Sequence, residues 1–227
     1  MNATAFALPS SGEELLAQMV AHNTVNPFFG GPVGGEAALI AHLGRLAQAW
    51  GLKTRRCPVP GGGENLLITC EVAPSAPWLL FESHLDTVSV AGMTVDPFVV
   101  SIANDRIHGR GTCDTKGSGA AMFWALQDYA RSADRPHNVG LLFAADEEAR
   151  MTGAQAFAAR ELKEFLPNLT GVVVGEPTSL QLVTAHNGVI RWKTTTRGRA
   201  AHSSVPANGR SAITAMLRVV EALESRY

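Results

Sequence analysis

Acidic and imidazole side chains follow three short apolar segments of this 227-residue chain. His84 and Asp86 follow the first segment, Glu147 and Glu148 follow the second, and Glu176 follows the third. Sites in α/β sheets form at the carboxyl ends of strands, so we expect these side chains to share one crevice. Because clustered carboxylates repel one another unless protons or cations neutralise them, the pattern predicts a divalent metal site.

The pair His84 and Asp86 allows more than one interpretation. The two residues are two positions apart, so both would point to one face if the strand continued to Asp86. Both could then bind metal, or His84 could bind while Asp86 holds its ring in place. A purely structural alternative puts Asp86 at a turn or a helix N-cap.

Asp114 lies in a glycine-rich segment, residues 109–117, whose glycines let the backbone approach a ligand closely. A phosphate loop is excluded, because the order of Lys116 and Gly117 is the reverse of the GK[ST] pattern. An acidic residue inside the loop also favours a cation over a phosphate. The alternative is that Asp114 forms an Asx turn or caps the following helix.

Glu147 and Glu148 are adjacent, so on an extended chain their side chains point to opposite sides. One carboxylate could bind metal while the other accepts a proton, which is the division of labour that metal-assisted hydrolysis needs. The sequence does not decide which does which. A solvated acidic loop is the alternative here and at Glu176, but the structural alternatives would have to hold at all four places together.

The segments that must position these residues alternate between strands and helices. Helices are expected from Ser11, over 36–50, after 119 and over 154–165; strands are expected over 65–72, 78–81, 139–145 and 172–174. This alternation predicts an α/β fold with a mixed, mostly parallel sheet flanked by helices.

From Gly188 onward the pattern changes. A strand over 189–196 and a helix from Ser211 predict the start of a smaller α+β domain. We therefore expect a first domain over residues 1–187 and a second over 188–227. His202, within the second, receives no role from its local sequence and is a surface histidine on that basis alone.

The composition excludes several classes of protein. Hydrophobic residues are 46% and charged residues 17% of the chain, so it is not a disordered protein. The net charge of −1 gives no reason to expect binding to nucleic acid or to an anionic membrane. Three scattered cysteines without a CxxC pair argue against disulfides and thiolate zinc sites. No signal peptide or membrane span is visible, so we expect a soluble, cytoplasmic protein.

Taken in order, these motifs resemble those of the M20 metallopeptidases, a family of zinc-peptidase-like amidohydrolases. The family includes acetylornithine deacetylase, succinyl-diaminopimelate desuccinylase, aminoacylase and the glutamate carboxypeptidases. The resemblance extends over nearly the whole chain from about Glu13. It rests on residues 83–88, 109–117, 146–148, 175–178 and 198–206.

The resemblance implies a pair of Zn²⁺ ions, for which Co²⁺ is a possible substitute. By analogy with the family, His84 and Glu176 would bind one ion, Glu148 would bind the other, and Asp114 would bridge the two. The open question about the adjacent glutamates is answered only by this analogy, which leaves Glu147 unbound.

The resemblance also implies three catalytic roles. Asp86 would orient His84, and Glu147 would be the general base that deprotonates a water molecule and passes the proton to the leaving amine. His202 matches the family's lid histidine, which reaches the partner subunit's active site and stabilises the oxyanion. Residues 188–227 would then begin a lid and dimerisation domain, so we expect a homodimer.

The substrate implied by the resemblance is a small N-acylated amino acid or a short peptide. Residues 175–180, 185–188 and 202–204 look closest to the acetylornithine deacetylase branch, which favours N-acetylornithine. A dipeptidase, a carboxypeptidase or a succinyl-diaminopimelate desuccinylase is the alternative within the family. A non-catalytic remnant or binding fragment is the alternative from another class.

Family members are longer than this chain and return from the lid to the catalytic domain, where a further histidine completes the zinc site. We therefore expect residues 1–227 to represent a fragment, a truncated reading frame or half of a split protein. Alone, they are expected to show little or no hydrolase activity, because one metal ligand would be missing.

Overall fold

A computed structural model describes residues 7–188, 190 and 192–226. The chain divides into two compact units, Met1–Gln181 and Leu182–Tyr227. The first unit contains the sheet and the predicted metal residues. The predicted domain boundary at 187/188 and the role of the second domain as a lid stay predictions.

The first unit is built on a five-stranded sheet with the order β1-β2-β6-β3-β7. β1 and β2 pair antiparallel, as do β2 and β6, whereas β3 pairs parallel with both β6 and β7. β2 alone therefore runs against the other strands of this sheet, which confirms the expected mixed and mostly parallel arrangement. The strands are β1 (Lys53–Pro58), β2 (Glu64–Cys70), β3 (Trp78–His84), β6 (Asn138–Ala144) and β7 (Leu169–Val174).

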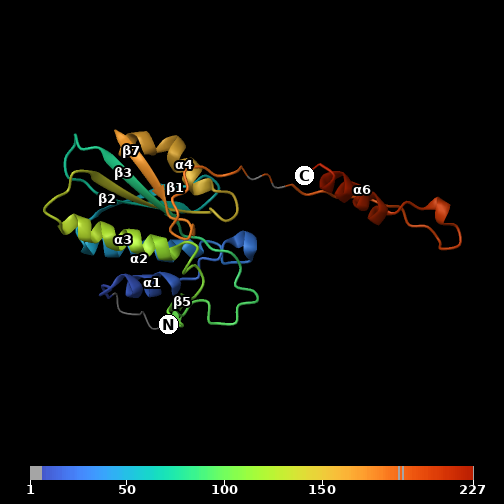
Figure 1. Cartoon of the computed structure of the whole chain (residues 1–227), viewed down its shortest axis with the longest axis horizontal. Coiled ribbons are helices and arrows are strands. Elements are labelled where there is room, and N and C mark those ends of the chain that lie inside the picture. Colours follow the sequence, from blue (N-terminus) through green and yellow to red (C-terminus); the bar gives the residue numbers. More distant parts are fainter. Residues whose placement is uncertain (1–6, 189, 191, 227) are drawn as a thin grey trace. The chain divides into compact units, whose positions relative to one another are not determined.

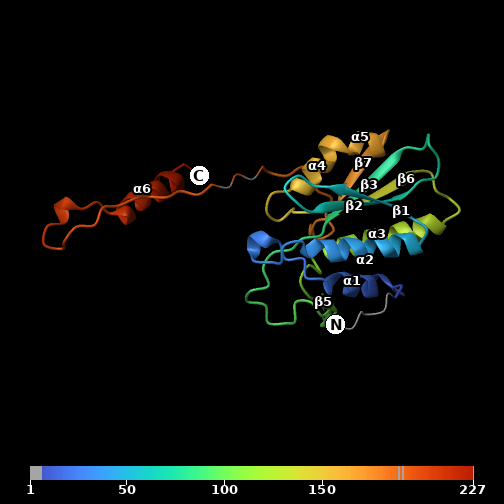
Figure 2. The ribbon, with the colours of Figure 1, turned by 180° about the vertical axis from the view of Figure 1, so that it is seen from behind.

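Helices cover both faces of this sheet, as Figures 1 and 2 show. α2 (Gly35–Ala49) and α3 (Lys116–Arg131) lie against one face, and α1 (Gly12–Val20) packs beneath them. α4 (Thr152–Arg160) and α5 (Leu162–Phe165) lie on the other face. The remaining elements of the unit are the 3-10 helix η1 (Pro27–Phe29) and a separate hairpin of β4 (Ser101–Ala103) and β5 (Arg106–His108).

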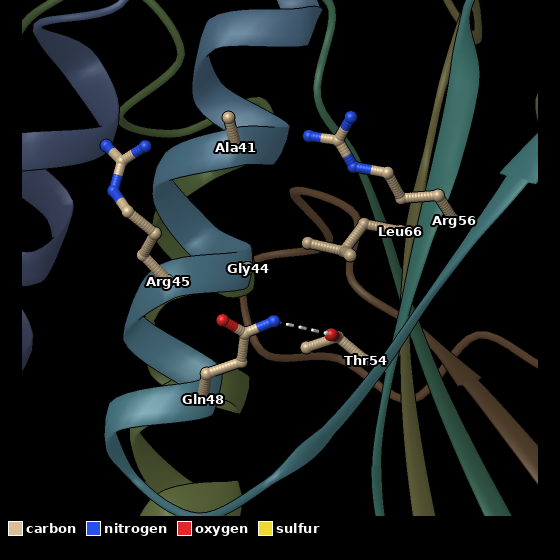
Figure 3. A pocket seen from close by; sticks show the side chains of 7 residues that line it. All are labelled: Ala41, Gly44, Arg45, Gln48, Thr54, Arg56 and Leu66. Atoms are coloured by element: carbon tan, nitrogen blue, oxygen red, sulfur yellow. Dashed lines mark hydrogen bonds between the residues drawn. The ribbon is translucent and has the colours of Figure 1, made fainter.

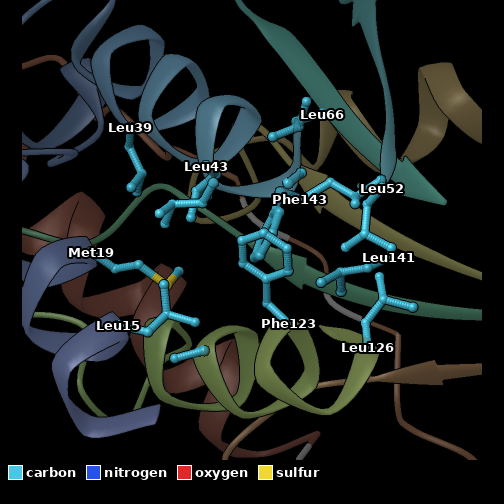
Figure 4. Close-up of a cluster of buried hydrophobic side chains, with 14 of the residues drawn as sticks. Leu15, Met19, Leu39, Leu43, Leu52, Leu66, Phe123, Leu126, Leu141 and Phe143 are labelled. Atoms are coloured by element: carbon cyan, nitrogen blue, oxygen red, sulfur yellow. The ribbon is translucent and has the colours of Figure 1, made fainter. Parts of the chain in front are cut away.

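The larger hydrophobic cluster fills the space between the sheet and α1, α2 and α3 (Figure 4). Leu39, Leu43 and Leu46 form the stripe predicted for α2, and all three are fully buried. Phe123 of α3 meets Phe143 of β6 edge to face, with ring centroids 5.9 Å apart. A smaller cluster packs the opposite face against α4 and the segment after α5. Burial on both faces explains why β6 is buried along its whole length and apolar after its first residue, Asn138.

Two elements differ from the sequence-based expectation. β1 was not predicted, because Lys53, Arg55 and Arg56 hide any apolar alternation; charged side chains are common on edge strands, where they discourage pairing with other chains. The helix expected over 154–165 is two helices that meet at Glu161, which ends α4 and begins α5.

The N-terminus of α1 provides a first testable prediction. The hydroxyl of Ser11 accepts a hydrogen bond from the backbone N–H of Glu14 at 3.2 Å. Because this cap satisfies an otherwise unpaired donor, Ser11→Ala is expected to lower the free energy of unfolding by about 1 kcal/mol. Urea denaturation measures this, with the exposed turn residue Ser75 changed to alanine as the control. Equal losses for the two variants would contradict the capping role.

The described residues of the second unit contain little regular structure. They include a 3-10 helix, η2 (Pro206–Asn208), the helix α6 (Ala212–Glu224) capped by Ser211, and a bridge between Arg199 and Arg210. The strand predicted over 189–196 is wrong for residues 190 and 192–196, which have no regular secondary structure; Val189 and Arg191 lie outside the described residues. An alternating pattern cannot form a ladder without a partner strand. Across the described part of the chain, no helix has the length and apolarity needed to cross a bilayer.

Candidate metal centre

The sheet brings the three chemically active strand ends to one edge. β6, β3 and β7 are consecutive and parallel, so their carboxyl ends lie side by side. His84 is the last residue of β3, Glu147 and Glu148 follow β6, and Glu176 follows β7. Asp114 joins them from the loop that leads into α3. The topology therefore collects the residues that the sequence singled out in the first unit.

His84 lies at the centre of this group. Its Nε2 atom is 2.9 Å from Oδ1 of Asp114, 3.9 Å from Oε1 of Glu176 and 4.0 Å from Oε2 of Glu147. One ligand atom from each of His84, Asp114 and Glu176 lies within 4.8 Å of the other two. An imidazole nitrogen with two carboxylate oxygens is a donor set that suits zinc and similar divalent ions. The residues present therefore fit a metal ion.

The electrostatics of the group favour a cation. Burial, together with Asp114, Glu147 and Glu148, raises the pKa of Glu176 to about 7. Burial and the nearby Asp114 also raise the pKa of Glu148. For His84, burial lowers the pKa, but the surrounding carboxylates outweigh it and raise the pKa to about 10. In the absence of metal, protons are thus drawn into the cluster, and a divalent ion would relieve the same repulsion.

Asp86 contacts the group through His84 and through the backbone of Glu147 and Glu148. β3 ends at His84, so the condition under which His84 and Asp86 would point to one face of the strand is not met. His84 Nδ1 donates to the backbone carbonyl of Asp86 at 2.9 Å, whereas the Asp86 carboxylate oxygen is 3.6 Å away. That carboxylate is fully buried and accepts the backbone N–H groups of Glu147 at 2.9 Å and Glu148 at 3.1 Å. Burial opposes its ionisation, yet these hydrogen bonds and His84 lower the pKa of Asp86.

Asp114 does not cap α3, which was the structural alternative for it. Thr115 occupies the N-cap position. The buried Thr115 hydroxyl donates to the carbonyl of His84 at 3.2 Å and lies 2.9 Å from the hydroxyl of Ser83. These contacts tie the glycine-rich loop to the end of β3 and hold Asp114 against the imidazole. Sequence analysis missed both hydroxyl residues, because each looks like an ordinary strand or loop residue.

Two further polar residues near the group were also missed. Asn26 lies in the glycine- and proline-rich segment before α2, and its amide contacts the Asp86 carboxylate at 2.7 Å. Glu36, in the first turn of α2, accepts the backbone N–H of Asp146 at 3.3 Å. Burial and the neighbouring Asp86 raise the pKa of Glu36 to about 7. No local spacing marks these residues, since their partners are 60 and 110 positions away.

His202 belongs to the second unit. Its side chain is exposed, and its Nδ1 atom accepts the backbone N–H of Ser204 at 3.2 Å and lies 2.8 Å from the Ser204 hydroxyl. With Nδ1 as the acceptor, the neutral ring carries its proton on Nε2. The role expected for His202 at the oxyanion stays a prediction.

A groove of about 350 Å³ lies elsewhere on the first unit, between α2 and the strands β1 and β2 (Figure 3). Gln48 and Thr54 close one part of it with a hydrogen bond of 3.4 Å, and Leu66 forms part of its lining. The residues of the metal group do not line this groove. By the metal group we mean the strand-end side chains of His84, Asp114, Glu147, Glu148 and Glu176. The groove is therefore separate from the chemistry at the strand ends.

Metal binding should stabilise the first unit measurably. Zn²⁺ or Co²⁺ at 100 times its dissociation constant is expected to raise the free energy of unfolding by about 2.7 kcal/mol. His84→Ala should abolish this gain, because it removes the central ligand. His137→Ala is the matched control, since His137 precedes Asn138, the first residue of β6, at the opposite end of the sheet. Urea unfolding with and without metal measures the effect, and an equal gain in the His84 variant would contradict the site.

Comparison with known protein families gives a clear match. A sequence model of peptidase family M20/M25/M40 matches residues 80–225. A probable carboxypeptidase of Aspergillus terreus is 40% identical over 151 residues, which are 64% of this chain and 33% of that protein. A probable succinyl-diaminopimelate desuccinylase of Staphylococcus aureus is 29% identical over 218 residues, covering 94% of this chain and 51% of that protein. This chain thus spans at most about half the length of these relatives.

The fold also matches solved structures. An M20 family metallo-carboxypeptidase from Sulfolobus solfataricus superposes with a TM-score of 0.64 at 20% sequence identity. The match covers 74% of this chain and 37% of that one. At this level of identity the likeness concerns the fold, which agrees with the mixed sheet and its flanking helices.

Proposed function

Since the chain belongs to peptidase family M20/M25/M40, we propose that the protein hydrolyses an amide bond with the help of metal ions bound at the strand-end group. The observation that carries this proposal is the convergence of His84, Asp114 and Glu176, whose ligand atoms lie within 4.8 Å of one another. Glu147 lies beside them, with its carboxylate 4.0 Å from the imidazole. This arrangement supports the proposal of a set of metal ligands with a separate proton acceptor beside it.

Each side chain has a proposed part in binding. His84 and Glu176 would hold one ion, Glu148 would hold a second, and Asp114 would contribute a ligand to both. Two observations support the bridging place of Asp114: it contacts His84 at 2.9 Å, and its charge raises the pKa of Glu148. Zinc is the proposed metal, and cobalt is the proposed substitute. When bound, the ions lower the pKa of a water molecule and polarise the carbonyl group of the substrate.

Glu147 is proposed as the general base. Its backbone N–H donates to the Asp86 carboxylate at 2.9 Å, which fixes the loop that carries its side chain beside His84. From there it can take a proton from water and return it to the leaving amine. His202 is proposed to stabilise, through a hydrogen bond from its Nε2–H, the oxyanion that develops on the substrate. A homodimer through residues 188–227 and a cytoplasmic location stay predictions.

The proposed substrate class is a small N-acylated amino acid or a short peptide. A carboxypeptidase and a desuccinylase, the names of the two relatives, both hydrolyse an amide bond, which supports the class without selecting a member. N-acetylornithine stays one candidate, beside N-succinylated amino acids and peptides with a free carboxyl terminus. The same metal group would serve all three, so selection among them must come from residues that contact the substrate.

The proposal is tested by a substrate panel on the protein purified at its native length and loaded with zinc or cobalt. The panel contains N-acetylornithine, N-succinyl-diaminopimelate, dipeptides and a carboxypeptidase substrate, and released amine is measured. We expect one class to be hydrolysed well above the others, and a chelator to abolish the activity. Metal binding without hydrolysis of any substrate would favour the non-catalytic alternative and contradict the proposal.

A further inference from the structure

Asn26 links the fully buried side chain of Asp86 to the partly buried side chain of Asp146, next to the metal group. Its side-chain nitrogen donates to Oδ2 of Asp86 at 2.7 Å and to Oδ1 of Asp146 at 3.0 Å. Its side-chain oxygen accepts the backbone N–H of Phe28 at 2.9 Å. An amide nitrogen carries two hydrogens, so one serves each carboxylate. The opposite orientation of the amide is excluded, because it would turn the oxygen toward two carboxylates.

The backbone around Asn26 holds this amide in place. Asn26 donates its own N–H to the carbonyl of Thr87 at 2.9 Å, and Val25 forms a parallel bridge with Thr87. Its carbonyl accepts the N–H groups of Phe29 and Gly31. Gly31 lies so close to the backbone of Val25 that a Cβ atom on Gly31 would be 1.7 Å from the carbonyl oxygen of Val25. Asn26 is 4% exposed, so water competes little for its hydrogen bonds.

The two carboxylates that Asn26 joins control the loop that carries Glu147 and Glu148. Asp86 accepts the backbone N–H groups of both glutamates. Asp146 directly precedes them in a left-handed backbone conformation, with φ of 58°, and its carboxylate also accepts the hydroxyl of Thr152 at 2.6 Å. Without a donor between them, the carboxylates of Asp86 and Asp146 would repel each other across this loop.

We propose that Asn26 is a positioning residue, which sets the place of Glu147 and Glu148 by holding the carboxylates of Asp86 and Asp146 together. The inference rests on the proposed function for its catalytic consequence, but the positioning itself concerns only this chain's residues. Groups that orient metal-binding residues without touching the metal commonly change metal affinity about 10- to 100-fold when they are removed. Asn26 meets that description through Asp86, whose backbone carbonyl accepts the imidazole N–H of His84.

The test compares Asn26→Ala with Asn138→Ala in the full chain. Asn138 is a matched control, because it is also buried and fully hydrogen-bonded but begins β6 at the end of the sheet opposite the metal group. Co²⁺ titration followed by visible absorption reports affinity and ligand geometry. We expect Asn26→Ala to weaken Co²⁺ binding about 10- to 100-fold and to change the absorption spectrum. Asn138→Ala should lower the melting temperature only.

A measurement on metal-free protein separates this inference from the proposed function. Amide hydrogen exchange at Glu147 and Glu148 should accelerate in Asn26→Ala relative to the amides of β6, and should not do so in Asn138→Ala. Unchanged exchange at both glutamates would overturn the positioning role, whether or not the protein hydrolyses anything. If Asn26→Ala does not fold, Asn26→Ser, which keeps one donor, takes its place. Failure of both variants to fold would assign Asn26 to the core and overturn the proposal.

A double-mutant cycle with Asp86→Asn adds a second check on the route of the effect. If Asn26 acts through the Asp86 carboxylate, its removal should change Co²⁺ affinity much less once that carboxylate is neutral. Additive losses in the double variant would show that Asn26 acts by another route, which would contradict the proposed mechanism of positioning.

Discussion

Glu147→Gln is expected to lower the turnover of the metal-loaded protein about 100- to 10,000-fold, the range that general base catalysis contributes in enzymes. The amide has nearly the same shape as the carboxylate but accepts no proton at neutral pH. The backbone N–H of residue 147 would still be held by Asp86, so the loop should keep its place. Initial rates on the best substrate of the panel, together with metal content by elemental analysis, measure this prediction.

Glu148→Gln provides the contrast for that experiment. The two glutamates are adjacent and share Asp86 as their backbone acceptor, so the variants differ mainly in which carboxylate is lost. Under the proposed roles, Glu147→Gln keeps its metal and loses turnover, whereas Glu148→Gln loses metal as well. Activity of Glu147→Gln within about tenfold of the unmodified protein would be too small a loss for a general base. If Glu147→Gln lost its metal and Glu148→Gln kept it, the two proposed roles would have to be exchanged.

Asp86→Ala is expected to lower the free energy of unfolding by about 3–5 kcal/mol, the usual cost of removing one member of a buried charged network. The fully buried carboxylate accepts N–H groups from Asn26, Glu147 and Glu148. Its removal leaves these donors without their acceptor in a place where water enters poorly. Urea denaturation of the metal-free protein measures the change, so that loss of metal does not contribute.

Asp128→Ala is the control for this variant. Asp128 lies on an exposed position of α3, where substitutions usually change stability by no more than about 0.5 kcal/mol. A loss below about 1 kcal/mol for Asp86→Ala would mean that the loop finds other partners for its N–H groups. In that case Asp86 would not be the support of the metal group that the hydrogen bonds indicate.

The order of elements and the location of the site were accessible from the sequence, because both depend on local patterns. The buried strand β6 shows as an apolar run, and the stripe of α2 shows as helical spacing at Leu39, Leu43 and Leu46. Residues that follow such strands must lie at a sheet edge, which places His84 and Glu176 near each other once the strands are parallel. The same reasoning failed where local signals are weak, at the charged edge strand β1 and over residues 190 and 192–196.

Only the tertiary structure decided which side chains support the metal group. Asp86 could have been a ligand, a turn residue or a support, and its hydrogen bonds with Glu147 and Glu148, about sixty positions along the chain, favour the role of a support. Asn26 looked like a loop residue until its amide was found between Asp86 and Asp146. Local patterns determine which segments become strands and helices, because those depend on neighbouring residues. Hydrogen-bond partners far apart in the chain follow from how the segments pack, and no pattern within one segment carries that information.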